Sequence, residues 1–281
     1  MLVTIVTVLS VLLAAVICAA VDAFAGLMWL WLLPLSFLGL WLVLALLSFL
    51  FLWAVCATVD MHIMPEKDDP FFRFLLNLYA EAIVTVLLMR VHKRGLEQVP
   101  KDGRFLLVCN HLNNIDPITL IAFFQQSQLS FISKKENDSM LIVGPLMRKT
   151  MCQPIDREND RAALKTILRC ISLVKEDEVS IAVFPEGYTS RDQKLHKFRN
   201  GAFKIAQKAN VPIVVCTLQN THTVFRNAMH LKPTDVELHL VGVIPAEELK
   251  GVTAVDIGNR VYDMMLSDLP ESFRPEEETE N

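Results

Sequence analysis

The chain opens with two long apolar runs. Residues 2–21 carry no charged side chain, and about 20 apolar residues are the length that a helix needs to cross a bilayer core. A second apolar run, residues 27–59, is broken by Pro34. Because proline is tolerated in the first turn of a helix, we expect a helix that begins at Pro34 and continues to about Val59. The pattern therefore predicts a hairpin of two transmembrane helices within residues 1–60.

A cleaved signal peptide is the alternative interpretation of residues 1–20, with Ala19 and Ala20 near the cleavage point. The segment lacks a basic start and a second apolar run follows at once, so two retained spans are favoured. Lysine and arginine are absent before Lys67 and frequent after it. The positive-inside rule then places the N-terminus and the rest of the chain on the cytoplasmic side of the cell membrane.

Residues 61–95 are expected to form an amphipathic helix and a linker. In residues 71–89 apolar side chains recur at helical spacing, and Arg73, Asn77 and Glu81 form a narrow polar stripe. Such a helix could lie in the membrane interface under the main domain, or it could belong to the core of that domain. The pattern does not choose between these two interpretations.

Short apolar runs alternate with helical patterns from residue 96 to residue 269. The runs that indicate strands are Phe105–Cys109, Leu129–Ser133, Cys152–Ile155, Val179–Phe184, Ile213–Leu218 and Val236–Val243. The helical patterns cover residues 117–127, 138–148, 160–175, 199–209 and 254–267. This alternation predicts an α/β domain with a largely parallel central sheet flanked by helices. Ligands of such sheets bind beyond the carboxyl ends of the strands.

Charge is distributed unevenly along the chain. The formal net charge is −2 for residues 1–60, +2 for residues 61–270 and −4 for the remaining tail, which together give −4. We expect the acidic tail, residues 270–281, to be disordered, and no polybasic run indicates nucleic-acid binding. The six cysteines form no Cys-x-x-Cys pair, which favours free buried thiols in a reducing compartment over disulfides or a zinc site.

A histidine and an aspartate follow the first strand of this domain. His111 lies just past the strand, and Asp116 precedes Pro117 at the expected start of a helix. The turn between them can bring the side chains together, and a carboxylate on one imidazole nitrogen raises the basicity of the other. The pair could then deprotonate a hydroxyl that attacks a thioester. The alternatives are a helix cap for Asp116 and a core histidine for His111.

Spacing alone does not identify this pair, because His230 and Asp235 are separated by the same distance in the chain. That second match lies between a polar loop and a strand, with Pro233 in the gap, and we interpret it as a surface coincidence. No Gly-x-Ser-x-Gly motif supplies a serine nucleophile. Cys109 is two residues before His111, and we expect it to pack inside the strand rather than to carry an acyl group.

Further motifs follow in the chain. They are Gln153–Arg157, Phe184–Gly187, Phe198–Ala202 and Val211–Val215. Taken in order with Asn110, His111 and Asp116, over about residues 90–245, they resemble the glycerolipid acyltransferases, specifically the 1-acylglycerol-3-phosphate acyltransferases. One position differs, because Thr189 stands where that family commonly has an arginine.

The resemblance implies a role for each matching residue. His111 would be the general base, and Asp116 would orient it. Arg191, on the same loop as Thr189, is the expected replacement for the missing arginine. The side chains and turn expected to bind substrate are Glu186, Gly187, Arg157, Arg191 and Asn110.

The resemblance also implies an activity. It is that of a membrane-bound O-acyltransferase that moves a fatty acyl group from acyl-CoA or acyl carrier protein to the free sn-2 hydroxyl of lysophosphatidate. The product would be phosphatidic acid for phospholipid synthesis, the partners would be these substrates and membrane lipids, and no metal or cofactor is implied. The alternatives are another acceptor, such as a different lysophospholipid or glycerol 3-phosphate, and a non-catalytic membrane-anchored module that binds acyl-CoA or scaffolds partners.

Overall fold

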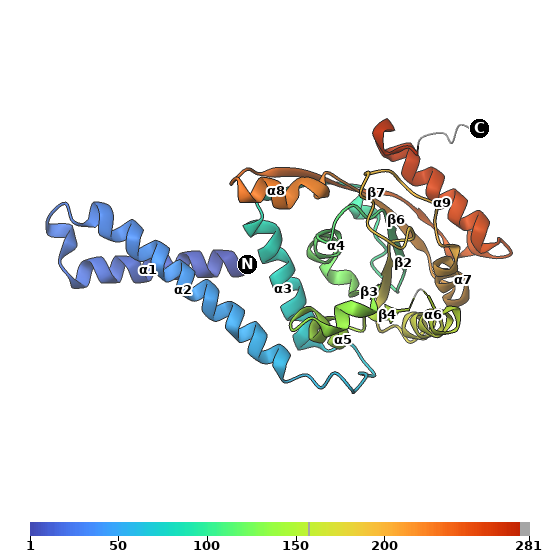
Figure 1. Cartoon of the computed structure of the whole chain (residues 1–281), viewed down its shortest axis with the longest axis horizontal. Helices are drawn as coiled ribbons and strands as arrows, with labels where there is room; N and C mark the ends of the chain where they lie inside the picture. The colour runs from blue at the N-terminus through green and yellow to red at the C-terminus, as the bar shows by residue number, and fades with distance from the viewer. Residues whose placement is uncertain (157, 276–281) are drawn as a thin grey trace. The chain divides into compact units, whose positions relative to one another are not determined.

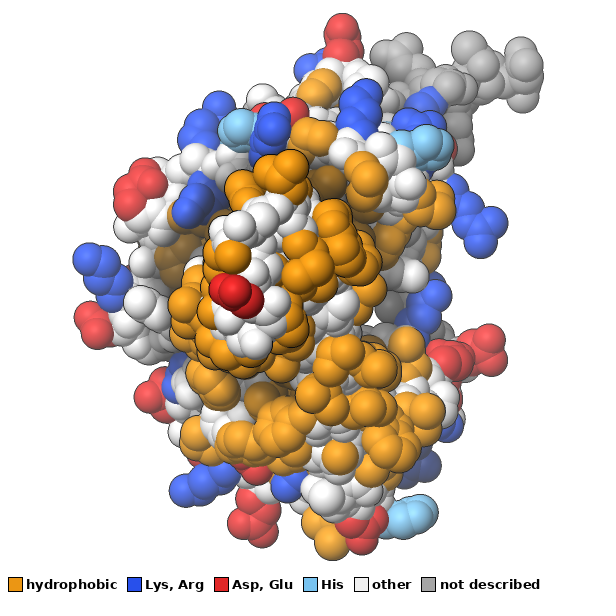
Figure 2. All heavy atoms as spheres, turned by 90° about the vertical axis from the view of Figure 1, so that its left-hand side faces the viewer, with side chains coloured by type: hydrophobic (Ala, Val, Ile, Leu, Met, Phe, Trp, Pro, Cys, Tyr) orange, Lys and Arg blue, Asp and Glu red, His pale blue; other side chains and the backbone are white. Residues whose placement is uncertain are grey.

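Two compact units make up the chain, Met1–Ile63 and Met64–Asn281, in a computed structural model that describes residues 1–156 and 158–275. The first unit contains helices α1 (Leu2–Ala20) and α2 (Trp29–Ala57), joined through the 3₁₀ turn η1 (Ala23–Ala25). Both helices are long and apolar enough to cross a membrane, and Figure 2 shows hydrophobic side chains over most of the end of this hairpin.

Helix α2 differs from the expectation at its start. It begins at Trp29, and Pro34 lies inside it rather than at its first turn. Proline has no N–H, so the bond to the carbonyl of Leu30 is missing, and the helix continues on both sides of the gap. The side chain of Trp41 donates to the Thr7 hydroxyl at 3.2 Å, which is a polar contact between α1 and α2.

The second unit is built on a seven-stranded sheet. Its strands are β1 (Met89–Arg94), β2 (Leu106–Cys109), β3 (Leu129–Lys134), β4 (Gln153–Ile155), β5 (Ser180–Val183), β6 (Ile213–Gln219) and β7 (Thr234–Ile244). Their order is β1-β7-β6-β2-β5-β3-β4. Neighbouring strands are parallel except β6 and β7. The carboxyl ends of β4, β3, β5, β2 and β6 therefore share one edge of the sheet, and β7 and β1 begin at that edge.

Helices cover both faces of this sheet (Figure 1). They are α3 (Pro70–Val86), α4 (Asp116–Phe123), α5 (Val143–Lys149), α6 (Asp160–Lys175), α7 (Lys204–Ala209), α8 (Val224–Met229) and α9 (Ala254–Asp268). Alternate residues of a strand face opposite sides, so Leu106 of β2 packs with α6, α7 and α9. Its neighbour Leu107 packs with α3, α4 and α8. The expected α/β architecture with a mostly parallel sheet is confirmed.

Three details differ from the sequence-based expectation. Strand β1 lies inside the segment expected to be a linker, because an edge strand with the sequence Met-Arg-Val-His-Lys-Arg lacks the apolar run that marks a buried strand. Helix α8 was not expected. The start of the acidic tail is ordered: Glu271–Phe273 form a 3₁₀ turn, Phe273 is buried, and its carbonyl accepts from the Leu195 N–H at 2.8 Å. Residues 276–281 lie outside the described residues.

Helix α3 belongs to the core of the second unit along one face. Ala80 and Val84 are buried in the cluster that covers the sheet. Arg73, from the polar stripe of the sequence pattern, is buried, where it pairs with Asp68 at 2.8 Å and donates to two backbone carbonyls. The opposite face of α3 leaves the ring of Phe74 half exposed.

Candidate active site

The candidate site lies where β2 and β5 end. The turn after β2 carries His111, and the turn after β5 carries Glu186, at the carboxyl edge shared by the parallel strands. Open parallel sheets bind their ligands at this edge because the strand-to-helix turns converge there. Two segments about 75 residues apart in the chain are therefore brought together by the pairing of β2 with β5.

His111 and Asp116 are in direct contact. His111 Nδ1 lies 2.9 Å from Asp116 Oδ2, and because an ionised carboxylate only accepts hydrogen bonds, Nδ1–H is the donor. The same oxygen accepts from the backbone N–H groups of Leu112 at 2.6 Å and Asn113 at 2.8 Å. Helix α4 begins at Asp116, one residue earlier than expected. The carboxylate therefore closes the turn in front of α4, and it leaves Nε2 of His111 as the basic nitrogen.

The surroundings hold this pair in place. Asp116 is fully buried, whereas the His111 side chain keeps 14% of its surface exposed. The His111 ring stacks on Phe184, with ring centroids 4.1 Å apart. Within the part of the chain that the structure describes, no hydrogen bond engages Nε2. Histidine is the side chain that most often acts as a general base, and an oriented ring with a partly exposed nitrogen without a hydrogen-bond partner is placed to accept a proton from a bound hydroxyl.

Glu186 connects two backbone segments. Its Oε1 accepts from the N–H of His111 and its Oε2 from the N–H of His196, both at 3.0 Å. Burial raises the pKa of Glu186 to about 6, although the two N–H donors act in the opposite direction. A further bond runs from the Ser190 N–H to the His111 carbonyl at 2.8 Å. The carboxylate thus fixes the His111 turn against the loop that follows β5.

Gly187 allows this loop to turn. Its φ of +82° lies in the region that glycine adopts readily, and a Cβ there would come 2.9 Å from Nε of Arg199. The expectation for Gly187 was substrate binding. In the structure, Gly187 instead allows the turn after β5 to approach the Arg199 side chain closely.

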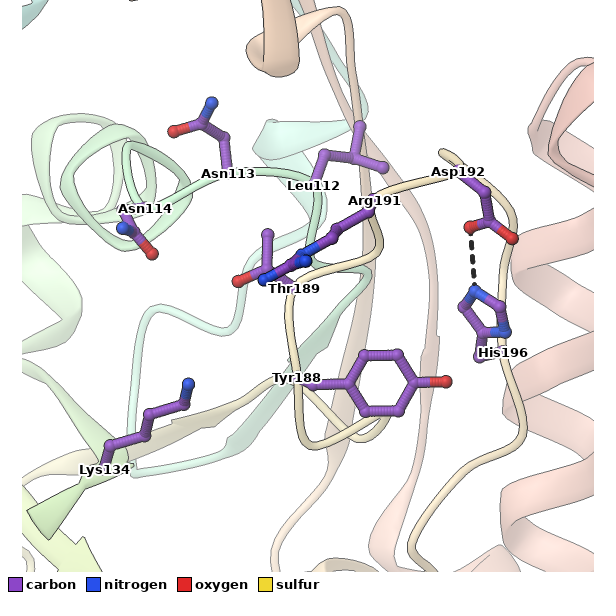
Figure 3. Close-up of a pocket in the computed structure, with 9 residues that line it drawn as sticks. All are labelled: Leu112, Asn113, Asn114, Lys134, Tyr188, Thr189, Arg191, Asp192 and His196. Carbon is purple, nitrogen blue, oxygen red and sulfur yellow. Dashed lines mark hydrogen bonds and ion pairs between the residues drawn. The ribbon is translucent and has the colours of Figure 1, made fainter.

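A cleft of about 720 Å³ opens beside the His111 turn. It is lined by Leu112, Asn113, Asn114, Lys134, Tyr188, Thr189, Arg191, Asp192 and His196. Figure 3 shows Lys134 extending from the end of β3 and Arg191 from the loop after β5, on either side of Thr189. His111 precedes the first of these lining residues. The cleft thus has two cations and adjoins the candidate base.

A second histidine–carboxylate pair lies in this cleft. His196 Nε2 is 2.8 Å from Asp192 Oδ1 (Figure 3). The Ser190 hydroxyl donates to the same oxygen at 2.8 Å. Partial desolvation acts to raise the pKa of Asp192, but the bonds from His196 and Ser190 outweigh it and lower this pKa to about 2. Sequence reasoning did not single out His196 or Lys134. Lys134 could have been found, because it ends a strand at the same carboxyl edge.

The remaining candidate residues have other surroundings. Asn110 is buried, and its side-chain amide exchanges two hydrogen bonds with the backbone of Leu218, at 2.9 and 2.7 Å, so it joins β2 to β6. Arg157 lies outside the described residues. Cys109 is buried, and desolvation raises the pKa of its thiol well above the usual value, as expected for a packed side chain. All six cysteines are buried and outside disulfide bonds.

The other histidine with the same spacing is not paired with its aspartate. His230 Nδ1 lies 2.8 Å from the backbone carbonyl of Arg226, and Asp235 pairs with His92 at 2.9 Å. Its interpretation as a coincidence is confirmed. Among residues 1–156 and 158–275, no group of three His, Cys, Asp or Glu side chains is arranged to hold a metal ion.

Comparison with known proteins finds similarity in the part of the chain that carries this site. A family model described as Acyltransferase matches residues 90–219, the stretch that carries the His111 turn, Glu186 and the cleft. The chain is 34% identical over 152 residues to the 1-acyl-sn-glycerol-3-phosphate acyltransferase BAT2, chloroplastic, of Brassica napus. It is 28% identical over 175 residues to a 1-acyl-sn-glycerol-3-phosphate acyltransferase of Cocos nucifera.

These matches cover part of each protein. They span 54% and 62% of this chain, and 43% and 56% of the length of the two plant relatives. The solved structure of the 1-acyl-sn-glycerophosphate (LPA) acyltransferase, PlsC, from Thermotoga maritima shares the fold, with a TM-score of 0.59 at 22% identity. That likeness covers 70% of this chain and 77% of the Thermotoga chain.

Proposed function

We propose that this chain is a membrane-bound acyltransferase that moves an acyl group from a thioester to the sn-2 hydroxyl of 1-acylglycerol-3-phosphate, giving phosphatidic acid. The observation that supports it best is the His111–Asp116 pair at 2.9 Å, which leaves one imidazole nitrogen free beside a cleft with two cations. The names of the plant relatives agree with this reaction.

In the proposed mechanism, Nε2 of His111 takes the proton of the acceptor hydroxyl as its oxygen attacks the thioester carbonyl. The carbon–sulfur bond then breaks, and the departing thiolate takes the proton back from the imidazolium. Asp116 keeps the ring in the required tautomer and stabilises the imidazolium while it exists. The donor is an acyl thioester, either acyl-CoA or an acylated carrier protein, and no redox step is involved.

Lys134 and Arg191 would bind the acceptor phosphate. Both line the cleft, and a phosphate monoester needs cations or N–H donors around its oxygens. Thr189 lies between them (Figure 3), at the position where the resembling family has its arginine. That substitution supports a second candidate, the same transfer to an acceptor with a different head group.

The two apolar helices of the first unit would anchor the protein, and the excess of lysine and arginine after them supports a catalytic unit on the cytoplasmic side. The acyl chain of the acceptor and the acyl chain of the thioester donor both partition into the bilayer. An enzyme that joins them must therefore reach the surface of the membrane. The anchor therefore suits the proposed substrates.

Labelled acyl transfer by the purified full chain in phospholipid vesicles tests the proposal. The acceptors would be lysophosphatidate, other lysophospholipids and glycerol 3-phosphate. His111→Ala should lower transfer to every acceptor at least about a hundredfold. His230→Ala, at the exposed histidine with the same spacing to an aspartate, should leave transfer unchanged. Transfer by His111→Ala near the unmodified rate would refute the mechanism, and a preference for an acceptor other than lysophosphatidate would favour the second candidate.

A further inference from the structure

A group of apolar side chains is exposed on the second unit, away from the cleft lining. It consists of Val86, Leu88, Phe225, Met229 and Leu231, and we refer to it as the α8 patch. We propose that the α8 patch lies against the surface of an anionic lipid bilayer and holds the candidate active site at the interface. This inference rests on the proposal that the chain is membrane-bound, and it adds a second contact to the apolar helices of the first unit.

Strand pairing brings the members of the patch together. Helix α8 and Leu231 precede β7, while Val86 and Leu88 precede β1, and Met89 is paired with Thr234 in parallel register. The Thr234 N–H also donates to the Leu88 carbonyl at 3.1 Å. Figure 1 shows α8 beside the end of α3, as this pairing requires.

The patch lies at the edge of the sheet that carries the candidate site. β7 is antiparallel to β6, and its beginning is paired with the end of β6, with Glu237 opposite Gln219. The beginnings of β7 and β1 are thus at the carboxyl edge, where the turn that holds His111 also lies. A bilayer in contact with the patch would face the edge from which lipid substrates must enter.

Two leucines of the patch have an unfavourable backbone as well as exposed side chains. Leu88 and Leu231 have φ values of +54° and +53°, a region in which glycine or asparagine is the usual residue. Leu231 is 84% exposed and Met229 is 77% exposed. The described fold therefore leaves most of the apolar surface of Leu231 and Met229 in contact with water, which is unfavourable. A contact outside the protein would bury this surface.

Charge around the patch indicates which surface it contacts. The two segments that hold its members, residues 86–90 and 224–232, contain three cations and no acidic residue: Arg90, Arg226 and Lys232. All three are exposed, and the nearby Asp235, opposite Arg90 in the strand register, pairs with His92. Basic side chains around exposed apolar ones are the pattern of proteins that bind anionic lipid surfaces, where each nearby cation adds attraction.

The opposite edge of the sheet differs in character. The segments before β2 and β5 carry five acidic residues against three basic ones: Glu97, Asp102, Glu176, Asp177 and Glu178 against Lys101, Arg104 and Lys175. Within the described residues 95–105 and 175–179, no large apolar side chain is exposed. This difference between two edges of one sheet favours a defined orientation at a membrane.

Fluorescence quenching by labelled lipid tests the proposal directly. Leu231→Cys and the control Lys101→Cys, exposed at the opposite edge, would each carry an environment-sensitive fluorophore in the full chain, reconstituted in vesicles of phosphatidylcholine with or without phosphatidylglycerol. The buried native cysteines make the unmodified chain the labelling blank. A nitroxide-labelled lipid should quench the label at 231 at least twofold more than the label at 101, and more strongly with phosphatidylglycerol.

Equal quenching at both positions, or none at 231, would overturn the proposal. So would a label at 231 that ignores lipid but responds to added acyl carrier protein, because the patch would then dock a protein. The same measurement in the His111→Ala background distinguishes this inference from the reaction: membrane contact without transfer preserves the inference, and transfer without membrane contact preserves only the proposed function.

A matched pair of variants tests the consequence for activity. In Leu88→Asn/Leu231→Asn, asparagine suits the positive φ, so the turns should form and the unfolding temperature should not fall. Transfer to long-chain lysophosphatidate in vesicles should drop several-fold, and transfer to a short-chain, water-soluble analogue should stay the same. Val252→Asn, a half-exposed apolar residue outside the patch, should change neither; an equal loss in both variants would also contradict the proposal.

Discussion

The buried carboxylates Asp116 and Asp268 each bind Nδ1 of a histidine at 2.9 Å, but the second nitrogen of each ring has different surroundings. Around His239, Glu237 lies 3.4 Å from Nε2, so both ring nitrogens have acidic partners. Around His111, the carboxylate takes two backbone N–H groups, and Nε2 has no partner among the described residues.

The locations of the two pairs differ as well. Asp116 lies in the turn between β2 and α4, beside the cleft. Asp268 ends α9 and also binds Thr217 of β6 at 2.5 Å and the exposed Arg94 of β1, so it joins the last helix to three strands. A histidine–aspartate contact is therefore common to structural and candidate catalytic sites. What distinguishes the candidate catalytic site is a second ring nitrogen without a partner among the described residues, in a turn whose next residues line a cleft.

The largest expected effect separates the two histidines by activity. His111→Ala should lower kcat by about 10²–10⁴-fold, the usual contribution of a general base. His239→Ala should leave kcat within about threefold of the unmodified chain. Both nitrogens of His239 already have acidic partners and the residue is outside the cleft lining, so its loss should affect stability by about the free energy of a hydrogen bond. Initial rates of acyl transfer at saturating acceptor measure both. Comparable losses in the two variants would remove the basis of the comparison.

The next effect separates the carboxylates by stability. Asp268→Asn leaves Thr217 and His239 with a poorer partner, and we expect it to cost roughly 2–3 kcal/mol of unfolding free energy, with kcat almost unchanged. The expected loss of unfolding free energy is limited because Arg94 is 66% exposed, so that water can solvate it. Unfolding of the detergent-solubilised chain by denaturant measures the cost, and Asp235→Asn, in a pair whose side chains are both more than half exposed, is the control. A variant that kept its stability and lost kcat would show that Asp268 takes part in the reaction.

Glu186 provides the effect that depends on pH. Its pKa is raised from 4.5 to about 6 by burial, so the folded state favours the protonated form. Its contribution to stability is complete below pH 4.5 and is lost as the pH rises through about 6, a change of about 2 kcal/mol. Glu186→Gln removes this titration.

The difference in unfolding free energy between the unmodified chain and Glu186→Gln should therefore shift by about 2 kcal/mol toward the variant between pH 4 and pH 7. The exposed Glu97→Gln serves as a control in which no such shift is expected. A difference that stays flat with pH, or that moves toward the unmodified chain, would show that folding does not raise the pKa of Glu186.

How far the sequence predicts this structure depends on how local each feature is. The strand Leu106–Cys109 is apolar on both faces because it is central and parallel, and such runs are visible in a sequence. The turn of His111 and Asp116 is also readable, since it closes over five residues. The edge strand Met89–Arg94 is not, because its alternate residues face solvent and only the ladder with β7 makes it a strand.

The rest of the site depends on contacts between distant segments. Glu186 could be selected by its motif, but its two backbone partners at His111 and His196 follow from the pairing of β2 with β5. Lys134 reaches the cleft because β3 lies next to β5. The sequence-based prediction assigned the phosphate to Arg157 and Arg191. The end of β3 marked Lys134 as a candidate at the carboxyl edge, but only the strand order places it in the same cleft as Arg191.

The smallest expected effect concerns His196 and Asp192, a pair intermediate between the other two. Both residues line the cleft, but their side chains are 31% and 49% exposed. Pairs of that exposure contribute about 1 kcal/mol or less to stability. His196→Asn keeps the backbone N–H that Glu186 accepts and removes only the imidazole. We expect kcat within about threefold of the unmodified chain and an acceptor KM raised no more than about fivefold, measured with lysophosphatidate and, for comparison, with a varied acyl-CoA. A KM change confined to the acceptor would place the imidazole beside the head group. A loss of kcat as large as that of His111→Ala would mean that a half-exposed histidine–aspartate pair can serve as the base. Burial of the carboxylate would then not be what distinguishes the catalytic pair.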